Sequence, residues 1–595
     1  MKHKGIGVMF LLLILMGMAV ARTTAKPGAT TYFVDRNHPA ANDSNPGTES
    51  APWRTIQKAA NTAVAGDTVY IKEGVYSERV TLANSGAAGG YITFKGYPGH
   101  SVVVDGTSNS GWHGLISIHG KDYIKVEGLE IRNNTVGWGV LVEHEEGNVN
   151  NAATHIALSD LDVHHTGGEA IQVRGNADDI LIENCVARDA LGSYSGIDIY
   201  QWDGGRPHHV TVTGCTAYNF PSFAGIASEQ ADNLLIENNV TYNSELGIDV
   251  GSGDNNMIRK NSVYSCTNGI ALSSNEDSEI YDNVIYNIYD EALYNYYWSA
   301  HGEAHARNKW YRNLIYNAGF GIYESNRKGT SGAEGPTSDH EYFNNVFYNI
   351  GTHGSYRTPF WWRGVQNIKF YNNTVYMNAG YTAFELTASS QGAEFLNNAV
   401  SISGNVAVYN INDGSSAAAR DYNCYWNRNG TVGAVGAHDV VGNPRFANAA
   451  VGDFHLQPNS PCIDAGTTLS GFGDDKDGRP RPQGARWDIG AYEFAPSLAL
   501  SGAPANRAIH LTWTVNVTPP VTSTWRIDYY SRTVASTVSF TGITNTTRAY
   551  TLAGLTNYAW YTVTLNAMLG STPFLTDTVR VMPTDRFVYL PIILR

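Results

Sequence analysis

The sequence predicts an all-β chain in which a parallel β-helix solenoid is followed by a small β-sandwich. A phrase that opens with asparagine returns every 22 to 32 residues, and inside each phrase apolar and polar residues alternate as in a strand. The segments between the phrases lack the periodicity of a regular helix. A unit of this length cannot bury its own core, so successive units must stack. The repeated residues are Asn239, Asn261, Asn283, Asn313, Asn345, Asn373 and Asn398.

The N-terminal segment predicts export. After Met-Lys-His-Lys, an apolar run extends from Val8 to Met18, and Ala19-Val20-Ala21 follows it. This is the pattern of a secretory signal at 1–21 that is cleaved before Arg22. The run is too short to span a bilayer, and later segments are not apolar enough to do so. We therefore expect a secreted or cell-surface protein without a transmembrane segment.

The solenoid itself is expected between two caps. Residues 22–100 hold a linker and an N-terminal cap, and a short helix there has one apolar face made by Ile56, Ala59, Ala60, Ala63 and Val64. Such a helix covers the open end of a solenoid, which terminal units need. Coils are expected over 101–426 and a C-terminal cap over 427–495.

The last part of the chain has a different pattern. Residues 496–505 are expected to be a linker, and clean alternation over 506–583 predicts short strands of a β-sandwich. The strand around Trp513 and the run from Tyr561 to Ala567 resemble the fibronectin type III pattern. The tail at 584–595 is either a surface-sorting signal or an ordinary last strand.

Two cysteines are expected to stack inside the solenoid. Cys185 and Cys215 each follow the first residue of a phrase, in the slot that Val240 fills on a later coil, so both are expected to point inward. They are either buried thiols or, because export permits it, a disulfide between coils.

Motifs near both ends of the solenoid resemble the caps of a known group. The motifs are Tyr32-Phe33-Val34-Asp35, Asp43-Ser44-Asn45-Pro46-Gly47-Thr48, Pro52-Trp53-Arg54-Thr55-Ile56-Gln57-Lys58-Ala59, Gly66-Asp67-Thr68-Val69-Tyr70-Ile71, Ser460-Pro461-Cys462-Ile463-Asp464-Ala465-Gly466 and Asp488-Ile489-Gly490-Ala491-Tyr492-Glu493. They resemble secreted right-handed parallel β-helix proteins of the pectate-lyase-like superfamily, which includes polysaccharide lyase family nine and several glycoside hydrolases. The resemblance implies a right-handed helix and export. Of the family-nine calcium motif Asp-Asp-Gly-x-Asp, this sequence keeps Gly196 and Asp198, and it lacks a lysine on the equivalent face.

A second ladder of strands displays carboxylates on consecutive coils. Its phrases are Gly-Val-Leu-Val-Glu (139–143), Ala-Ile-Gln-Val-Arg (170–174), Gly-Ile-Asp-Ile-Tyr (196–200), Gly-Ile-Ala-Ser-Glu (225–229), Gly-Ile-Asp-Val-Gly (247–251) and Gly-Ile-Ala-Leu-Ser (269–273). The Ile and Val positions point inward, so the alternate positions face solvent. Asp198, Glu229 and Asp249 are therefore expected to face outward together, and Arg174 lies one coil earlier.

This carboxylate group is the expected catalytic centre. A strand spacing of about 4.8 Å puts Asp198 and Asp249 roughly 9–10 Å apart, with Glu229 about 8 Å from each. Inverting glycosidases need two carboxyl groups about 6.5–9.5 Å apart. Alternatively, Asp198, Asp203 and Asp249 hold Ca²⁺, which takes six to eight oxygens, and Arg174 or Tyr200 acts as the base of an elimination. The third alternative is a solvated acidic face without function.

Large aromatic residues follow the same face. Rings spaced along a rod suit stacking on successive sugars, and exposed apolar patches usually mark binding sites. The residues expected to bind substrate are Tyr200, Trp202, Tyr294, Trp298, Tyr323, Arg327 and Trp361. The alternative is that several of the rings pack beneath loops. The pair His208-His209 has the wrong spacing for a zinc site and receives no role.

The sequence thus favours an extracellular enzyme, a polysaccharide lyase or glycoside hydrolase, that acts as a monomer, with Ca²⁺ as the cofactor of the lyase alternative. Two other classes stay open: a non-catalytic carbohydrate-binding protein, and a structural or adhesive cell-surface protein. The net charge of -14 argues against nucleic acid as a partner.

Overall fold

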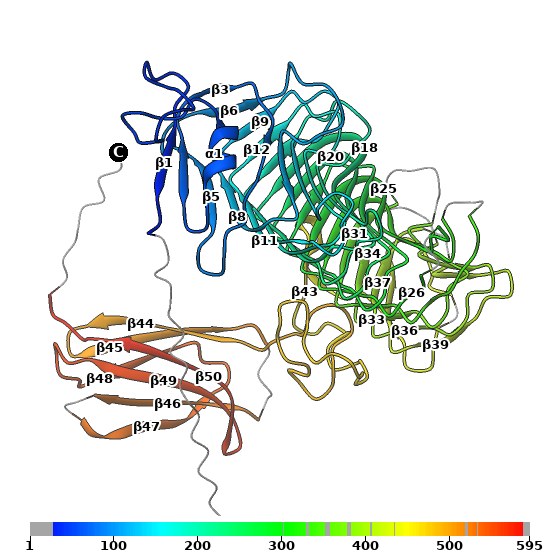
Figure 1. The fold of residues 1–595 in the computed structure, drawn as a ribbon. Helices are drawn as coiled ribbons and strands as arrows, with labels where there is room; N and C mark the ends of the chain where they lie inside the picture. The colour runs from blue at the N-terminus through cyan, green and yellow to red at the C-terminus, as the bar shows by residue number, and fades with distance from the viewer. Residues whose placement is uncertain are drawn as a thin grey trace, which may run out of the picture.

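The computed structural model describes residues 28–300, 303–328, 332–351, 358–377, 382–404, 407–433, 435–517, 522–531 and 534–586. The export signal expected at 1–21 and most of the tail expected at 584–595 lie outside these residues. The described chain forms a stack of coils from β1 (Thr31–Val34) to β39 (Ala417–Asp421), followed by a small β-domain (Figure 1). The predicted all-β class with a parallel solenoid is confirmed.

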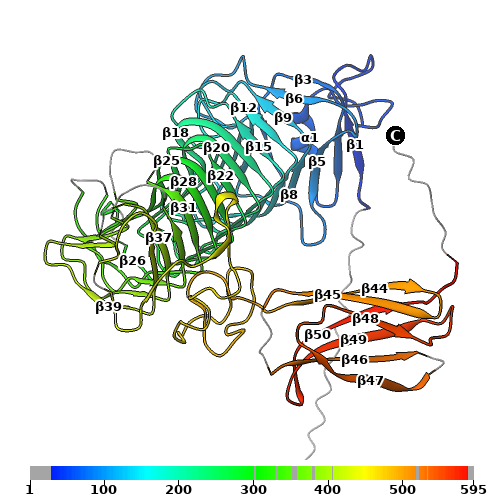
Figure 2. The same ribbon diagram turned by 180° about the vertical axis from the view of Figure 1, so that it is seen from behind.

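Each coil contributes strands to three faces, named A, B and C here, and each strand pairs in parallel with its equivalent on the next coil (Figure 2). Face A is a 15-stranded sheet formed by β1, β2 (Thr68–Ile71), β5 (Ile92–Gly96), β8 (Asp122–Glu127), β11 (Ala153–Ser159), β14 (Ala177–Glu183), β17 (His208–Thr213), β19 (Leu235–Glu237), β21 (Met257–Arg259), β24 (Glu279–Tyr281), β27 (Lys309–Tyr311), β30 (Glu341–Phe343), β33 (Lys369–Tyr371), β36 (Ala393–Leu396) and β39. Face B contains β3 (Gly74–Tyr76), β6 (Val102–Asp105), β9 (Glu130–Arg132), β12 (Asp162–His164), β15 (Val186–Arg188), β22 (Ser262–Tyr264), β31 (Val346–Ile350), β34 (Thr374–Tyr376), β37 (Ala399–Ile402), β40 (Cys424–Asn427) and β41 (Val440–Val441).

Face C contains β4 (Val80–Thr81), β7 (Ile116–His119), β10 (Val140–Glu143), β13 (Ile171–Arg174), β16 (Ile197–Tyr200), β23 (Asn268–Ser273), β32 (Phe360–Arg363), β35 (Phe384–Thr387) and β38 (Tyr409–Ile411). Four long strands continue from face B onto face C: β18 (Thr216–Glu229), β20 (Val240–Gly251), β25 (Val284–Tyr296) and β28 (Leu314–Ser325). The loops that leave face C lead back to face A, and β26 (His305–Ala306) and β29 (Thr337–Ser338) pair within two of these loops.

The repeated asparagines form a buried ladder at the corner between faces A and B. The side-chain oxygen of Asn283 accepts hydrogen bonds from the backbone and side-chain amides of Asn261, at 2.9 and 3.0 Å. Its side-chain nitrogen donates to the carbonyl of Ile258 at 2.9 Å and to Asn313 at 3.0 Å. The same pattern continues along the stack to Asn423. The ladder therefore satisfies the backbone groups that a sharp, buried corner leaves without a strand partner.

The residue before each ladder asparagine makes the corner possible. Asn238, Lys260 and Asp282 have φ values of 57°, 55° and 56°, which is the left-handed region. This bend turns the chain from face A to face B within two residues. Inside the corner, apolar side chains such as Ile258, Ile285 and Trp310 are fully buried and stack on their equivalents in neighbouring coils.

The N-terminal end is closed by helix α1 (Ile56–Thr62), whose Ile56, Ala59 and Ala60 are buried. The Thr55 side chain accepts a hydrogen bond from the backbone N–H of Lys58 and so caps the helix N-terminus. The helix packs against strands β1 and β4, as the apolar face in the sequence predicts. Val64, which was predicted to share that face, instead lies beyond the end of the helix and is exposed.

The two stacked cysteines are buried, but for a different reason from the one predicted. Cys215 lies on the asparagine ladder itself, because its backbone N–H donates to the side chain of Asn239 at 2.8 Å. Cys185 is one coil earlier, and its N–H faces the Cys215 sulfur at 3.4 Å. The Val240 slot, which was expected to point inward, is half-buried on the outer side, and Thr241 points inward instead. Both cysteines are free thiols in the structure.

The segment after the last coils covers the outer side of face B. It contains β42 (Phe446–Asn448), the 3-10 helix η1 (Ala449–Val451) and β43 (Asp453–Leu456). Phe454 and Ile489 of this segment share one apolar cluster with Val346, Ala399 and Cys424 of the coils.

The small β-domain that follows has two antiparallel sheets. One contains β44 (Leu498–Ala505), β45 (Ala508–Val515) and β48 (Ala549–Ala553), and the other contains β46 (Thr524–Ser531), β47 (Val534–Thr544), β49 (Tyr561–Leu569) and β50 (Thr572–Val581). Trp513, Trp525 and Val563 are part of its own apolar core. The fibronectin type III resemblance of this domain stays a prediction.

We predict that Asn283→Ala lowers the free energy of unfolding by about 3 kcal/mol or more, since it leaves the buried Asn261 N–H and the Ile258 carbonyl without partners. The measurement is urea-induced unfolding followed by circular dichroism. Asn287→Gly is the control: Asn287 is exposed, has a φ of 53° that glycine accepts, and accepts one bond from Asn317. Its effect is expected to stay under about 1 kcal/mol. Equal losses in the two variants would contradict a special role for the buried ladder.

Candidate active site on face C

Three carboxylates lie in register on face C, as the repeat pattern predicts. Asp198 of β16 aligns with Ala227 of β18, and Ala227 aligns with Asp249 of β20. Glu229 aligns with Tyr200, which is two residues beyond Asp198. The outward positions expected from the sequence are therefore the outward positions of the structure, and two strand spacings of about 4.8 Å separate Asp198 from Asp249.

The three carboxylates line one pocket of about 220 Å³. The lining residues are Glu169, Gln172, Ser193, Tyr194, Asp198, Tyr200, Phe223, Ala227, Ser228, Glu229 and Asp249. Gln172 holds Asp198 by donating its side-chain N–H to Oδ2 at 3.1 Å. Trp138 donates its ring N–H to Glu169 at 2.7 Å. The Oδ1 atom of Asp249 is buried and has no hydrogen-bond partner among the described residues.

Burial and crowding make several of these carboxyls hard to ionise. Burial raises the pKa of Asp198 well above its ordinary value, and the neighbouring Glu169 raises it further. Burial also raises the pKa of Asp249 to about 7, although the ammonium group of Lys328 opposes this shift. For Glu169, burial raises the pKa above its ordinary value despite the bond from Trp138. The pocket thus contains carboxyl groups that hold their protons to higher pH than ordinary carboxyl groups do, and Asp249 titrates near neutral pH.

A second pocket of about 220 Å³ lies on the preceding coils of face C. Its lining residues include Trp112, His119, Trp138, Glu143, His144, Arg174, Trp202 and Asp203. The Arg174 guanidinium lies 4.6 Å from the ring centres of both Trp138 and Trp202, and its Nε donates to Glu143 at 2.5 Å. Trp112 and Trp202 are 50% and 46% exposed, so their rings are open to a ligand. The pocket has the flat apolar surfaces on which sugar rings stack.

The structure divides the predicted residues between these two pockets. Asp198, Glu229, Asp249 and Tyr200 share the first pocket, which we call the carboxyl pocket, and Arg174, Trp202 and Asp203 line the second, which we call the tryptophan pocket. Asp203 was expected to join Asp198 and Asp249 at a metal ion, but its carboxylate instead faces His144 at 3.8 Å.

The aromatic residues predicted on later coils continue the same ladder. Tyr294 is in register with Tyr323, and Tyr323 with Trp361, with ring centres 5.7 and 5.2 Å apart. Tyr323 is buried between its neighbours, whereas Tyr294 and Trp361 are half-buried. Trp298 lies beneath the ammonium group of Lys328, 4.0 Å from its ring centre, and Arg327 faces Glu334 at 3.8 Å.

Calcium does not fit the carboxyl pocket as a preformed cage. Asp178, His208 and His209 lie away from this pocket. Among the residues that the structure describes, they are the only group of three or more His, Cys, Asp or Glu side chains whose ligand atoms lie within 4.8 Å of one another. Calcium takes six to eight oxygens at about 2.3–2.6 Å, which requires carboxylates that converge. We therefore derive no catalytic step through a metal ion.

Several residues of the site were not predicted from the sequence, and three of them show why. Glu169 comes from the bend before β13, Trp112 from the loop before β7, and Lys328 from the loop after β28. Two of them lie in loops whose lengths do not repeat. For Glu169 a signal existed, because it directly precedes the second-ladder phrase that begins at Ala170.

Comparisons with known proteins agree with this architecture. Residues 32–221 match the family model described as a Pel9A-like, right handed beta helix region, and residues 146–329 match the model described as a right handed beta helix region. The chain thus carries the right-handed parallel β-helix fold, and the resemblance that the sequence motifs predict is confirmed. None of the helices in the described part of the chain has the length and apolar character that crossing a bilayer requires.

Two curated relatives match part of the chain. Uncharacterized protein YwoF of Bacillus subtilis is 36% identical over 147 residues, which are 23% of this chain and 30% of that protein. Pectate lyase PEL9 of Emericella nidulans is 29% identical over 113 residues, which are 17% of this chain and 28% of that protein. The chain therefore spans less than a third of the length of either relative.

Solved structures show a weaker likeness. Pectate lyase Pel9A is 14% identical, with 78% of this chain and 97% of that chain covered and a TM-score of 0.37. The complex of XylC with xylose is 12% identical, with 82% and 100% covered and a TM-score of 0.43.

We predict that Asp249 makes stability depend on pH. Its pKa is raised from 3.8 to about 7, so the folded protein holds a proton that the unfolded chain has lost. The free energy of unfolding should therefore fall as pH rises from about 4 to 7, and Asp249→Asn should remove this part of the fall. Urea unfolding at a series of pH values measures it.

Asp277→Asn is a control of opposite sign. The guanidinium of Arg307 holds the pKa of Asp277 below its ordinary value, so its contribution is lost as pH falls. If the wild type and Asp249→Asn keep a constant difference from pH 4 to 7, Asp249 is not perturbed as described.

Proposed function

We propose that this chain is an extracellular enzyme that cleaves a polysaccharide bound along face C, and that Asp198, Glu229 and Asp249 carry the reaction. The observation that supports it most is the carboxyl pocket, where acids of raised pKa lie beside a pocket lined by tryptophans. A solvated acidic face would not require buried carboxyls or a neighbouring set of open indole rings. A rod with a long face suits a chain-like substrate. The expected monomer and its export belong to this proposal.

Hydrolysis is the reaction that the geometry favours. The raised pKa of Asp198 favours its protonated form, which is suited to donate a proton to the oxygen of the leaving sugar. Asp249, with a pKa of about 7, is suited to take a proton from an attacking water. The two are separated by two strand spacings, roughly 9–10 Å, close to the 6.5–9.5 Å of inverting glycosidases. Glu229 lies on the coil between them, and its charge raises the pKa of both.

Elimination is the second candidate, because residues 32–221 match a Pel9A-like model and one relative is named a pectate lyase. Lys328 favours it too, because elimination needs a base and this lysine, in the loop after β28, is near enough to lower the pKa of Asp249. Arg174, which the sequence offered as the base, lies in the tryptophan pocket and is ion-paired to Glu143. In our proposal Arg174 positions the substrate.

A panel of neutral and acidic polysaccharides separates these alternatives. New reducing ends alone indicate hydrolysis. Absorbance at about 235 nm, expected for an unsaturated product, indicates elimination. Loss of activity with a chelator, restored by Ca²⁺, would favour elimination. Retardation of the protein in a polysaccharide gel without cleavage indicates a binding protein, and the absence of both would point to a structural or adhesive role.

We predict that Asp198→Asn, Glu229→Gln and Asp249→Asn each lower the cleavage rate at least about 100-fold, the scale for loss of a general acid or base. Glu279→Gln is the matched control, because Glu279 lies on β24 of face A, outside both pockets, with a side chain that is 40% exposed. It should retain activity within about threefold. Initial rates on the best substrate of the panel give the comparison. Full activity in all three variants would place the reaction elsewhere.

The charge of the two pockets favours a neutral substrate. Seven carboxyl groups line them, and the single arginine among their lining residues is already paired with Glu143. A uronate would add a further negative charge among these carboxyl groups, and bringing charges of like sign together is unfavourable. Neutral sugars instead offer hydroxyl groups to the carboxylates and apolar ring faces to the tryptophans.

We therefore predict that methyl-esterified homogalacturonan binds at least about 10-fold more tightly than the same chain after its esters are removed. Affinity electrophoresis at fixed ionic strength measures this ratio on an otherwise identical polymer. Tighter binding of the de-esterified chain would contradict the preference for neutral sugars, and the same result only in Ca²⁺ would support elimination.

A further inference from the structure

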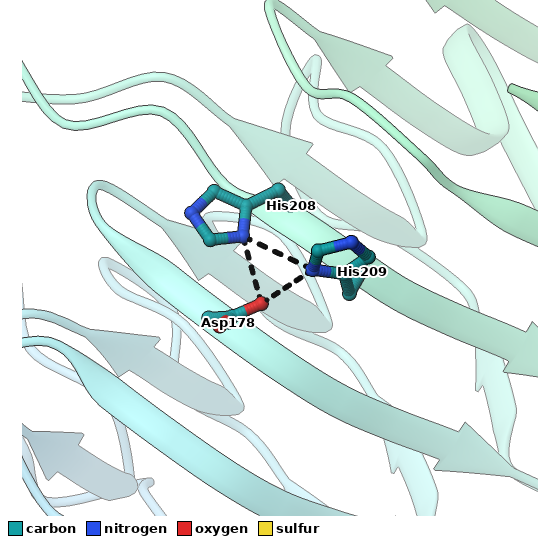
Figure 3. Close-up of side chains that lie close together, drawn as sticks. All are labelled: Asp178, His208 and His209. Atoms are coloured by element: carbon teal, nitrogen blue, oxygen red, sulfur yellow. Dashed lines mark hydrogen bonds and ion pairs between the residues drawn. The ribbon is translucent and has the colours of Figure 1, made fainter. Parts of the chain in front are cut away.

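A second group of side chains lies on face A, apart from the two pockets. Asp178 is on β14, and His208 and His209 begin β17 on the next coil. The Oδ1 atom of Asp178 lies 2.7 Å from Nδ1 of His208 and 2.8 Å from Nδ1 of His209. The two Nδ1 atoms are 3.3 Å apart, so the three atoms form a small triangle (Figure 3).

The fold explains why neighbouring histidines face the same carboxylate. Consecutive side chains of a regular strand point to opposite sides, but His209 has a φ of 51°, in the left-handed region. The same bend recurs on adjacent coils, where His155, Asp179 and Asn233 have φ values of 55°. The bend is therefore a feature of the repeat, and only on this coil does the sequence place two imidazoles at it. Sequence spacing could not reveal the group, because Asp178 comes from the preceding coil.

The triangle has a size that a metal ion can bridge. A tetrahedral zinc ion at about 2.0–2.2 Å from its ligands separates them by about 3.3 Å. The two nitrogens already have this spacing, and the carboxylate oxygen, at 2.7 and 2.8 Å from them, would move outward by about half an ångström. Without an ion, two imidazole nitrogens must share one carboxylate oxygen while facing each other. All three side chains are partly exposed, at 36%, 38% and 62%, which leaves room for water as a further ligand.

A later coil shows what the same place looks like without a metal. There, Arg307 donates to Asp277 at 2.8 Å and makes an ordinary ion pair between coils. An arginine cannot ligate a cation, because it is always protonated. Histidine nitrogens with one carboxylate are instead the donor set of zinc and similar divalent transition metals, whereas calcium and magnesium prefer oxygen alone.

We propose that Asp178, His208 and His209 bind one divalent transition-metal ion of the zinc class. The ion ties β14 to β17 of the next coil. His208 directly follows the loop 201–207, which carries Trp202 and Asp203 into the tryptophan pocket. The other anchor of this loop is Arg206, which is held by Asp232 at 2.7 Å and Glu303 at 2.8 Å. The bound metal therefore fixes the end of this loop. The importance of the loop for substrate binding rests on the proposed function, whereas metal binding itself does not.

The test is titration of the metal-free full chain with Zn²⁺ by isothermal calorimetry, with thermal unfolding as a second readout. We expect a site that Asp178→Asn and His208→Gln each weaken at least about 10-fold, and a melting temperature that Zn²⁺ raises in the wild type but not in these variants. Ca²⁺ and Mg²⁺ should not compete. Asp179→Asn is the matched control, since Asp179 is the adjacent residue and contacts His155 at 3.3 Å instead.

Equal Zn²⁺ affinity in the wild type and Asp178→Asn would overturn the proposal, as would the absence of binding to the wild type or an equal loss in Asp179→Asn. Melting curves recorded without metal show whether each variant folds. Because these readouts need no substrate, they stand even where the polysaccharide panel shows no cleavage. Where cleavage is found, a chelator effect that Zn²⁺ but not Ca²⁺ reverses would separate this site from a calcium-dependent elimination.

Discussion

Stacking of the coils in register is the constraint on which the rest of this structure depends. The buried asparagine ladder carries that register, because each side chain binds backbone groups of the preceding coil and the amide of the next asparagine. A slip of one residue would turn every outward side chain of face C inward. It would also break several buried hydrogen bonds on every coil, each of which is expensive to leave unmade. The ladder thus fixes which side chains can meet on the outside.

The candidate site is a direct consequence of that register. Asp198, Glu229 and Asp249 are far apart in sequence, yet they lie on successive coils and line one pocket. Parallel stacking at about 4.8 Å per coil brings like charges within two coils of one another, and burial removes the water that would screen them. The fold therefore raises the pKa of Asp198 and Asp249 without a dedicated catalytic loop. The loops contribute the surrounding surface, with Trp112 and Trp202 on one side and Lys328 on the other.

The parts predicted from the sequence are those that the repeat governs. Periodicity identified the coils, the outward positions of face C and the three carboxylates, because a strand alternates and the coils repeat. The predicted position of Cys215 within the repeat was wrong by one residue. Gly214 was aligned with the ladder asparagines and Cys215 with the residue after them, whereas Cys215 itself takes the place of the asparagine. Lys328 and the separation of Asp203 from Asp198 depend on loops whose lengths differ between coils, so neither follows from a period. The contact of His208 and His209 with Asp178 could not be predicted either, because Asp178 lies one coil earlier in the chain.

The most direct test of the account is a crystal structure of the Asp198→Asn variant with a bound oligosaccharide from the best substrate of the panel. The account predicts a sugar chain along face C, stacked on Trp112 or Trp202 at one end, with a glycosidic oxygen above residue 198 and within reach of Asp249. An oligosaccharide bound on face A, on face B or only on the small β-domain would contradict the claim that register on face C creates the site.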